Sequence, residues 1–165
     1  MPYSREIKKR RVSEAVVDYG ETVSTATSGQ HEYLSLLGLR SCDTAALMKR
    51  LDDGISYAAF ERLKRKLGVS SKELGDAALI TQRTLARRKK AGRLNPDESD
   101  RLVRVSRVFS RAIELFGGDA EAARSWLMRP VLALGGAVPF GMLKTEVGAG
   151  EVERLITQLE HGVVI

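Results

Sequence analysis

The stretch ELGDAALITQRTLARRKKAGRL, residues 73–94, decides the fold of this 165-residue chain. Its pattern predicts two short helices joined by a tight turn, which is a helix-turn-helix. Such a pair needs a small residue early in the first helix, so that the second helix can cross closely, and apolar residues in the turn and midway along the second helix. Gly75, Ile80 and Leu85 occupy these three places.

Leu79 departs from this pattern, because many turns of this kind carry glycine there to adopt a left-handed backbone. A helical hairpin with a charged, solvated surface is the alternative interpretation. Packing alone does not explain so many basic residues on the second helix, since like charges repel one another at i,i+4 spacing. The sequence therefore favours the helix-turn-helix.

The second helix of the pair has the side chains of a DNA-reading helix, with no acid among them. Four residues at its start can contact base edges in a major groove: Thr81, Gln82, Arg83 and Thr84. Five basic residues further along suit contacts with phosphates, which fix the register on DNA: Arg87, Arg88, Lys89, Lys90 and Arg93. The sequence thus predicts a base-reading and a phosphate-binding part of one helix.

The charge distribution agrees with this interpretation. The chain has a net charge of +6, but residues 61–93 alone carry eleven Lys/Arg against three Asp/Glu. The segments on either side are balanced or slightly acidic. A concentrated basic segment is the footprint expected where a phosphate backbone is bound, although a solvated helical face can have the same composition.

Helix start and stop signals continue on both sides of this segment and predict an all-α fold. The expected helices cover 43–54, 56–68, 70–78, 81–92, 95–117, 119–128, 139–146 and 149–161. Gly148 is expected to end the helix before the last one. Only YLSLLGL, residues 33–39, has a pattern that could form an extended strand.

Composition and punctuation suggest how the chain is divided. Residues 1–30 are expected to form a flexible arm whose basic residues 5–11 could touch DNA. Residues 31–94 would form a helix-turn-helix domain for DNA binding and dimerisation, and residues 95–165 a second helical domain. The sequence shows neither a secretory signal nor a membrane span, and the single Cys42 excludes an internal disulfide framework. A soluble, reduced, cytoplasmic protein is expected.

Catalytic chemistry is poorly represented. The histidines, His31 and His161, lie in the arm and at the end of the last helix, and Cys42 has no histidine near it in sequence. The glycines of GAG, residues 148–150, follow a helix and not a strand, so they do not form a dinucleotide fingerprint. We therefore expect neither an enzyme nor a bound cofactor or metal.

Several motifs occur in an order that resembles a known family. RTLARRK (residues 83–89), ESDRL (98–102) and AIELFG (112–117) precede a C-terminal pattern over residues 123–163 that includes PFGMLKTEVGAGEV. Together they resemble the Xre/MbcA/ParS-type antitoxins that partner RES-domain toxins. The resemblance covers about residues 40–165. Met142 stands where the family pattern usually has leucine.

The resemblance implies an antitoxin that neutralises a toxin by covering its active-site entrance. Toxins of this class consume NAD⁺, and complexes of this type often bind operator DNA and repress their own operon. Carried over to this chain, the family pattern places toxin contacts at Trp126, Pro139, Leu143, Thr145, Leu159, Gly162, Val163, Val164 and Ile165. The main alternative is a stand-alone repressor whose C-terminal domain dimerises or senses a ligand. A toxin gene beside this one would distinguish the two.

Two expectations concern assembly. The apolar GVVI at residues 162–165 is predicted to lie in the toxin's cleft, although it could instead fold onto the chain's own core. The apolar stripes of helices 56–67 and 95–117 exceed what a small domain needs, which predicts a homodimer that matches two DNA half-sites. With toxin, a hetero-oligomer is expected.

Overall fold

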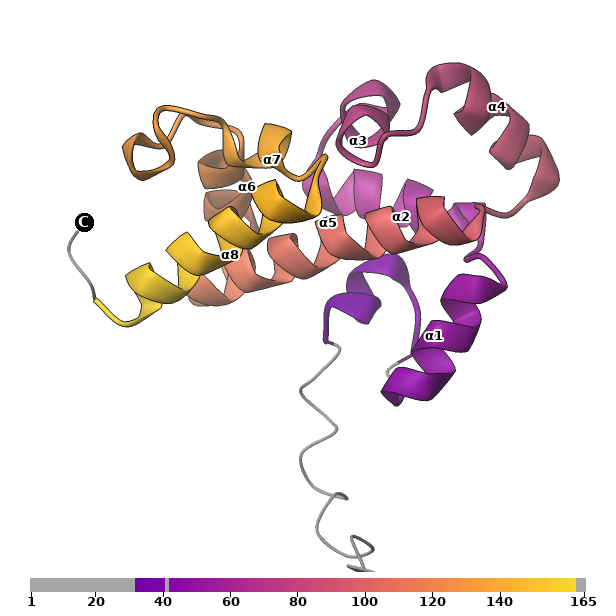
Figure 1. Ribbon diagram of the computed structural model, residues 1–165, viewed down its shortest axis with the longest axis horizontal. Helices are drawn as coiled ribbons and strands as arrows, with labels where there is room; N and C mark the ends of the chain where they lie inside the picture. The colour runs from indigo at the N-terminus through magenta and orange to yellow at the C-terminus, as the bar shows by residue number, and fades with distance from the viewer. Residues whose placement is uncertain (1–31, 41, 163–165) are drawn as a thin grey trace, which may run out of the picture.

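The computed structural model describes residues 32–40 and 42–162, and this part of the chain is all-α, as predicted (Figure 1). With η marking a 3-10 helix, the elements are η1 Glu32–Leu37, α1 Thr44–Asp52, α2 Tyr57–Leu67, α3 Ser71–Ala77, α4 Gln82–Ala91, α5 Pro96–Leu115, α6 Ala120–Leu127, η2 Leu132–Leu134, α7 Pro139–Met142 and α8 Glu146–Glu160. Residues 5–11 of the basic arm and Val163, Val164 and Ile165 lie outside the described residues.

The helix starts are confirmed by their caps. The side chains of Asp43, Ser56 and Thr81 each accept a hydrogen bond from a backbone N–H in the first turn of the helix that follows. Ser70 and Glu73 form a reciprocal capping box at α3. These side chains satisfy N–H groups that have no partner within the helix, which is why their positions predict where helices begin.

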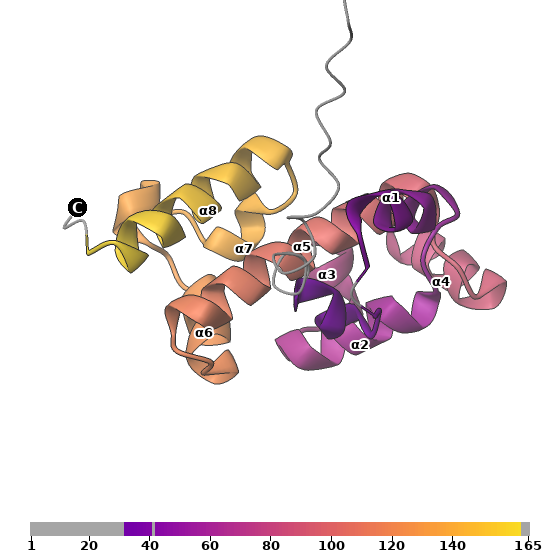
Figure 2. The same ribbon diagram turned by 90° about the horizontal axis from the view of Figure 1, so that it is seen from below.

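The long helix α5 forms the centre of the molecule. It packs against η1, α1 and α2 on one side, and against α6 and α8 towards its C-terminal end (Figures 1 and 2). Its stripe of Leu102, Val105, Phe109 and Ala112 is fully buried. The apolar face of α2 is likewise buried within the chain. The premise of the predicted homodimer was therefore wrong, because the chain's own elements cover both stripes.

Two local predictions are corrected. Residues 33–39 form the 3-10 helix η1 and its turn, not a strand, because the i,i+3 spacing of Leu34 and Leu37 buries both side chains. Gly148 does not end a helix. It lies in the first turn of α8, where its N–H donates to Thr145 Oγ1 at 3.0 Å, and α7 ends earlier, at Met142.

The structure also bears on membranes and metals. Across the described residues, no helix is long and apolar enough to cross a membrane. In the same part of the chain, no group of three or more His, Cys, Asp or Glu side chains could hold a metal ion.

Candidate nucleic-acid interface and partner surface

The turn between α3 and α4 has the left-handed backbone of a helix-turn-helix, although Leu79 stands where glycine is usual. Leu79 has a φ of +54°, so it takes the left-handed conformation usually given to glycine. The Ile80 N–H donates to the Gly75 carbonyl at 2.7 Å and the Leu79 N–H to the Asp76 carbonyl at 3.3 Å, which together form a Schellman ending of α3. Leucine in place of glycine at residue 79 therefore leaves the turn unchanged. Its left-handed backbone costs about 1 kcal/mol of strain relative to glycine.

Gly75 performs the role predicted for it. A Cβ atom at this position would lie 2.7 Å from the Ile80 carbonyl oxygen and 3.1 Å from Leu85 Cδ1. Both neighbours are buried in the core. The two helices of the helix-turn-helix thus cross closely because residue 75 has no side chain.

The exposed face of α4 is strongly basic. Leu85 is its one buried residue. Most of the predicted DNA contacts are exposed: Thr81, Gln82, Arg83, Arg87, Lys89, Lys90 and Arg93. Thr84 is half-buried. Its N–H donates to Thr81 Oγ1 at the helix start, and the Thr81 hydroxyl in turn donates to Thr84 Oγ1. Arg93 donates to the Asp53 carbonyl at 2.8 Å, which fixes its guanidinium beside the end of α1.

Arg88 does not belong to this face. Its Nε and Nη2 donate to the two carboxylate oxygens of Glu98 in α5, at 2.7 and 3.0 Å, and the two side chains are only 13% and 9% exposed. Burial disfavours the charged form of Glu98, but hydrogen bonds from Arg88 and from the Asn95 N–H outweigh it and hold the pKa of Glu98 below its usual value. Arg88 is therefore removed from the predicted phosphate contacts, because its charge is used inside the protein.

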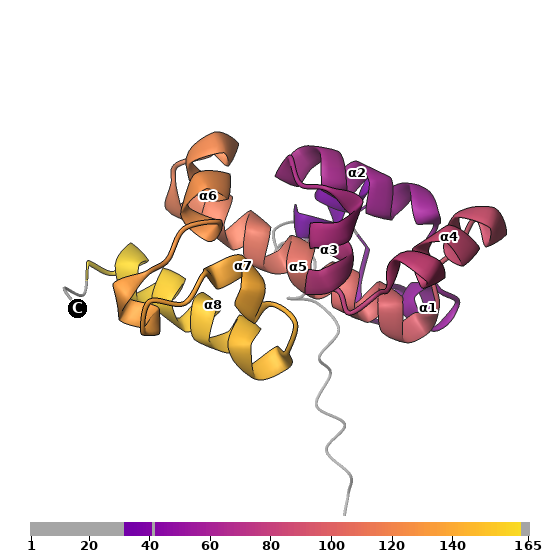
Figure 3. The same ribbon diagram turned by 90° about the horizontal axis from the view of Figure 1, so that it is seen from above.

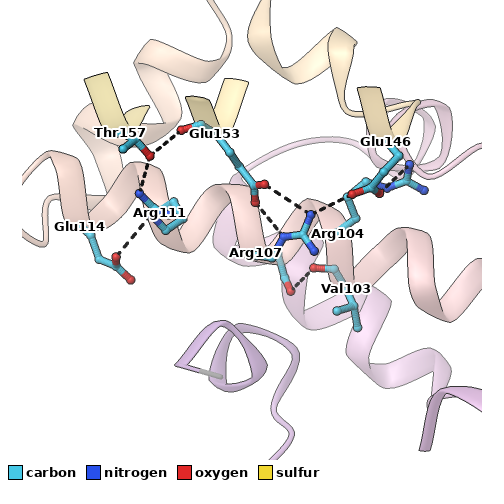
Figure 4. A network of polar contacts seen from close by, with 9 residues as sticks. Val103, Arg104, Arg107, Arg111, Glu114, Glu146, Glu153 and Thr157 are labelled. Carbon is cyan, nitrogen blue, oxygen red and sulfur yellow. Dashed lines mark hydrogen bonds and ion pairs between the residues drawn. The ribbon is translucent and has the colours of Figure 1, made fainter. Parts of the chain in front are cut away.

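A row of ion pairs attaches α8 to α5, and Figure 4 shows those that Arg104 and Arg107 form with Glu146 and Glu153. The row consists of Arg104–Glu146, Arg107–Glu153 and Arg111–Glu160, at 3.5, 2.7 and 2.8 Å. Arg111 Nη2 also donates to Thr157 Oγ1 at 3.2 Å. Beneath this row, Val152, Leu155 and Ile156 of α8 are buried. The row and the buried face fix the direction in which α8 presents its C-terminal end.

Some of the predicted toxin contacts are buried within the chain, and others reach the surface. Leu143 is 0% exposed and Pro139 is also buried, so both pack in the chain's own core and their assignment as surface contacts was wrong. Trp126 is half-buried, with its ring 6.3 Å from that of Phe116. Thr145 caps α8 but remains exposed.

Two predicted toxin contacts near the end of α8, Leu159 and Gly162, are exposed. The exposed fraction of Leu159 is 40%. Two large apolar side chains that sequence reasoning missed are more exposed still. Leu132 in η2 is 94% exposed and Val147 in the first turn of α8 is 80% exposed. The signal for Leu132 was an apolar run that ends in two glycines, Gly135 and Gly136. Such a run marks a short turn whose apolar residues have little core to enter.

Comparisons with known proteins agree with both halves of the molecule. Residues 46–107 match the model of the antitoxin Xre-like helix-turn-helix domain, and residues 111–162 that of the antitoxin Xre/MbcA/ParS C-terminal toxin-binding domain. An "Antitoxin Xre" of Yersinia enterocolitica is 37% identical over 77% of this chain and 86% of its own length. One of Photorhabdus laumondii is 33% identical over 78% and 87%. A "Prs ADP-ribosylating antitoxin" of Sphingobium is 27% identical over 79% and 86%.

Proposed function

This chain belongs to the Xre family of antitoxins, and from that premise we propose that it neutralises a cognate RES-domain, NAD⁺-consuming toxin by covering its active-site entrance. The family consists of antitoxins and not of enzymes. Its two matched domains imply a toxin and DNA as binding partners.

One observation carries the choice of the toxin-binding surface. Leu132 is 94% exposed in a domain whose own core is closed by Leu127, Leu143 and Val152, all fully buried. Single exposed apolar residues are common on proteins. Here Leu132, Val147 and Leu159 are all exposed within the matched toxin-binding domain, and none of them is needed by the described core. Burial of such side chains against a partner would stabilise the complex.

The proposed contact includes the end of the chain. The apolar residues Gly162, Val163, Val164 and Ile165 would follow α8 into the toxin's cleft. The ion pairs between α5 and α8 support this part of the proposal, because they fix the helix that precedes these residues in the sequence. Trp126 and Thr145 remain proposed contacts beside it.

The name of one relative bears on the chemistry of the proposed toxin. The name of the Sphingobium relative refers to ADP-ribosylation, a reaction that draws on NAD⁺, which supports a toxin of NAD⁺ chemistry. We propose a DNA-binding domain over residues 31–94 and a toxin-binding domain over 95–165. The central helix α5 falls in the second range but packs against elements of both, and the helix-turn-helix match extends into it as far as residue 107. A hetero-oligomer with toxin in the cytoplasm would carry both activities.

Binding of operator DNA, alone or with toxin, is proposed for the exposed face of α4. Arg83, Arg87 and Lys90 lie at i, i+4 and i+7, on one side of the helix, and all are exposed. Gln82 at the start of α4 is placed to reach a base edge. Binding at the chain's own promoter would repress its operon.

The toxin proposal is tested in cells. The open reading frame next to this gene is expressed alone and together with this chain, and growth and intracellular NAD⁺ are followed. Growth arrest with falling NAD⁺, relieved by this chain, is the expected result. A neighbour that is not toxic, or a toxicity that this chain does not relieve, would favour the stand-alone repressor instead.

A further inference from the structure

Lys144 belongs to the C-terminal half of the chain but lies beside the helix-turn-helix. It connects α7 to α8, and α7 packs against α3 (Figure 3). Lys144 thereby forms one wall of a shallow groove of about 240 Å³ at the turn of the helix-turn-helix. The groove is lined by Gly75, Asp76, Leu79, Ile80, Thr81 and Lys144.

The lining of the groove contains one lysine and one carboxylate. Asp76 is the one carboxylate in its lining, and that carboxylate is paired with Lys72 Nζ at 3.0 Å. Lys144 is exposed and forms no ion pair within residues 32–40 and 42–162. A neighbouring hollow also contains Glu73, whose carboxylate accepts the Ser70 N–H at 2.8 Å. Lys144 lines the same groove as Thr81, the residue that caps α4.

Leu79 contributes an apolar side chain to the groove. Its left-handed backbone is strained, and no contact within the described residues explains why leucine stands there. The side chain is 56% exposed, and its residue is the one described non-glycine with a positive φ. Glycine would adopt this backbone without strain, and an exposed leucine gains little from burial to offset that strain. A contact that this protein makes with a partner would account for leucine at this position.

We propose that Lys144 and Leu79 extend the DNA-binding surface beyond α4, with Lys144 on a backbone phosphate and Leu79 against the adjacent sugar. The proposal rests on the proposed binding of operator DNA by α4, because Thr81 lines the groove and also caps that helix. The lysine and the continuity with α4 select DNA as the occupant: Lys144 forms no ion pair within the described residues, and Thr81 joins the groove to the start of the basic helix. The domain that binds toxin therefore also contributes a phosphate contact to DNA binding.

Salt dependence of DNA binding tests the role of Lys144. The full chain, with and without its toxin, is titrated with a duplex covering the promoter upstream of its gene, at several salt concentrations. Lys144→Ala is expected to weaken binding about fivefold. It should also reduce the slope of log K against log salt by about 0.9, the value for one lost phosphate contact. Lys49→Ala, which removes an exposed lysine from α1, should leave the slope unchanged.

The outcomes separate this inference from the function it rests on. If the unaltered chain binds the promoter and Lys144→Ala keeps the slope, the inference is wrong while operator binding stands. If the unaltered chain binds no DNA, with or without its toxin, both the inference and the proposed operator binding are wrong. Loss of toxin neutralisation by Lys144→Ala with DNA binding intact would assign the groove to the toxin.

Leu79→Gly provides a second, independent test. This variant removes the left-handed strain, so its melting temperature should stay equal or rise while its affinity for the duplex falls. Unchanged affinity in a stable Leu79→Gly chain would contradict the contact proposed for Leu79.

Discussion

Arg88 of α4 and Glu98 of α5 form a two-bonded ion pair that is almost closed to solvent, with Nε–Oε2 and Nη2–Oε1 distances of 2.7 and 3.0 Å. The same carboxylate accepts the Asn95 N–H at 2.9 Å. Glu98 thereby caps the central helix and holds α4 against it. This carboxylate, together with the buried Leu85, therefore fixes the orientation of the proposed DNA interface.

Glu98→Gln is expected to lower the free energy of unfolding by about 2 kcal/mol, because it leaves the buried guanidinium of Arg88 without its charged partner. Chemical denaturation at neutral pH measures the loss. Asp76→Asn provides the control, since it removes the exposed pair with Lys72 and should cost less than about 0.5 kcal/mol. Equal losses in the two variants would contradict the special role of Glu98.

The same pair predicts a pH dependence. The folded-state pKa of Glu98 lies below its unfolded value of about 4.3, so its contribution is complete above that pH and is lost as pH falls through the folded-state pKa. The stability difference between the unaltered chain and Glu98→Gln should therefore be constant from neutral pH to about 5 and shrink at lower pH. A difference independent of pH down to the acid unfolding transition would exclude this linkage.

Alanine substitutions at two glycines of α8 distinguish the effect of close packing from that of helix propensity. A Cβ atom at Gly148 would collide with the Met142 carbonyl, whereas at Gly150 it would meet no atom within 4 Å. Gly148→Ala should destabilise the protein by about 2 kcal/mol. Gly150→Ala should stabilise it by about 0.5–1 kcal/mol. Thermal melts of both variants check the pair, and a stabilised Gly148→Ala would show that the connection between α7 and α8 is looser than described.

Most helix starts could be predicted because their signals are local. The capping box of Ser70 and Glu73 acts within four residues, and so does the cap at Thr81. The tight crossing at Gly75 was also predictable, because the spacing from Gly75 to Ile80 and Leu85 is fixed by the motif. The family resemblance was predictable from motif order.

The errors arose where a residue's role depends on distant parts of the chain. Gly148 resembled a helix end, but glycine is needed there because the Met142 carbonyl lies close. Arg88 resembled its basic neighbours until the fold placed Glu98 beside it. Leu143 fitted a family pattern of toxin contacts, yet it packs in the core. Burial of this kind cannot be derived from spacing alone.

Within the proposed interface, Arg87 and Gln82 should respond differently to substitution. Arg87→Ala is expected to weaken binding to all DNA sequences alike, because it removes a phosphate contact. Gln82→Ala is expected to change which bases are preferred, by about 1–3 kcal/mol at one position. Binding to a randomised set of duplexes measures both effects. Equal loss with unchanged preference in both variants would refute the assigned roles.

The partner surface is tested at Leu132. Leu132→Asp should change the free energy of unfolding by no more than about 0.5 kcal/mol, because the side chain is 94% exposed. The same change should weaken toxin binding at least tenfold, since a carboxylate would replace an apolar contact. Calorimetric titration of toxin measures the affinity, and Ala133→Asp beside it serves as an exposed control. Full affinity in Leu132→Asp would move the surface elsewhere on the domain.

The most direct measurement is the rate at which the purified toxin consumes NAD⁺ as this chain is added, compared with a chain that ends at His161. The account predicts that the full chain stops NAD⁺ consumption at saturation, and that the shortened chain keeps its melting temperature but fails to inhibit. If NAD⁺ consumption continues in the presence of saturating full-length chain, or the shortened chain inhibits equally well, the proposed covering of the active site by the C-terminal end is wrong.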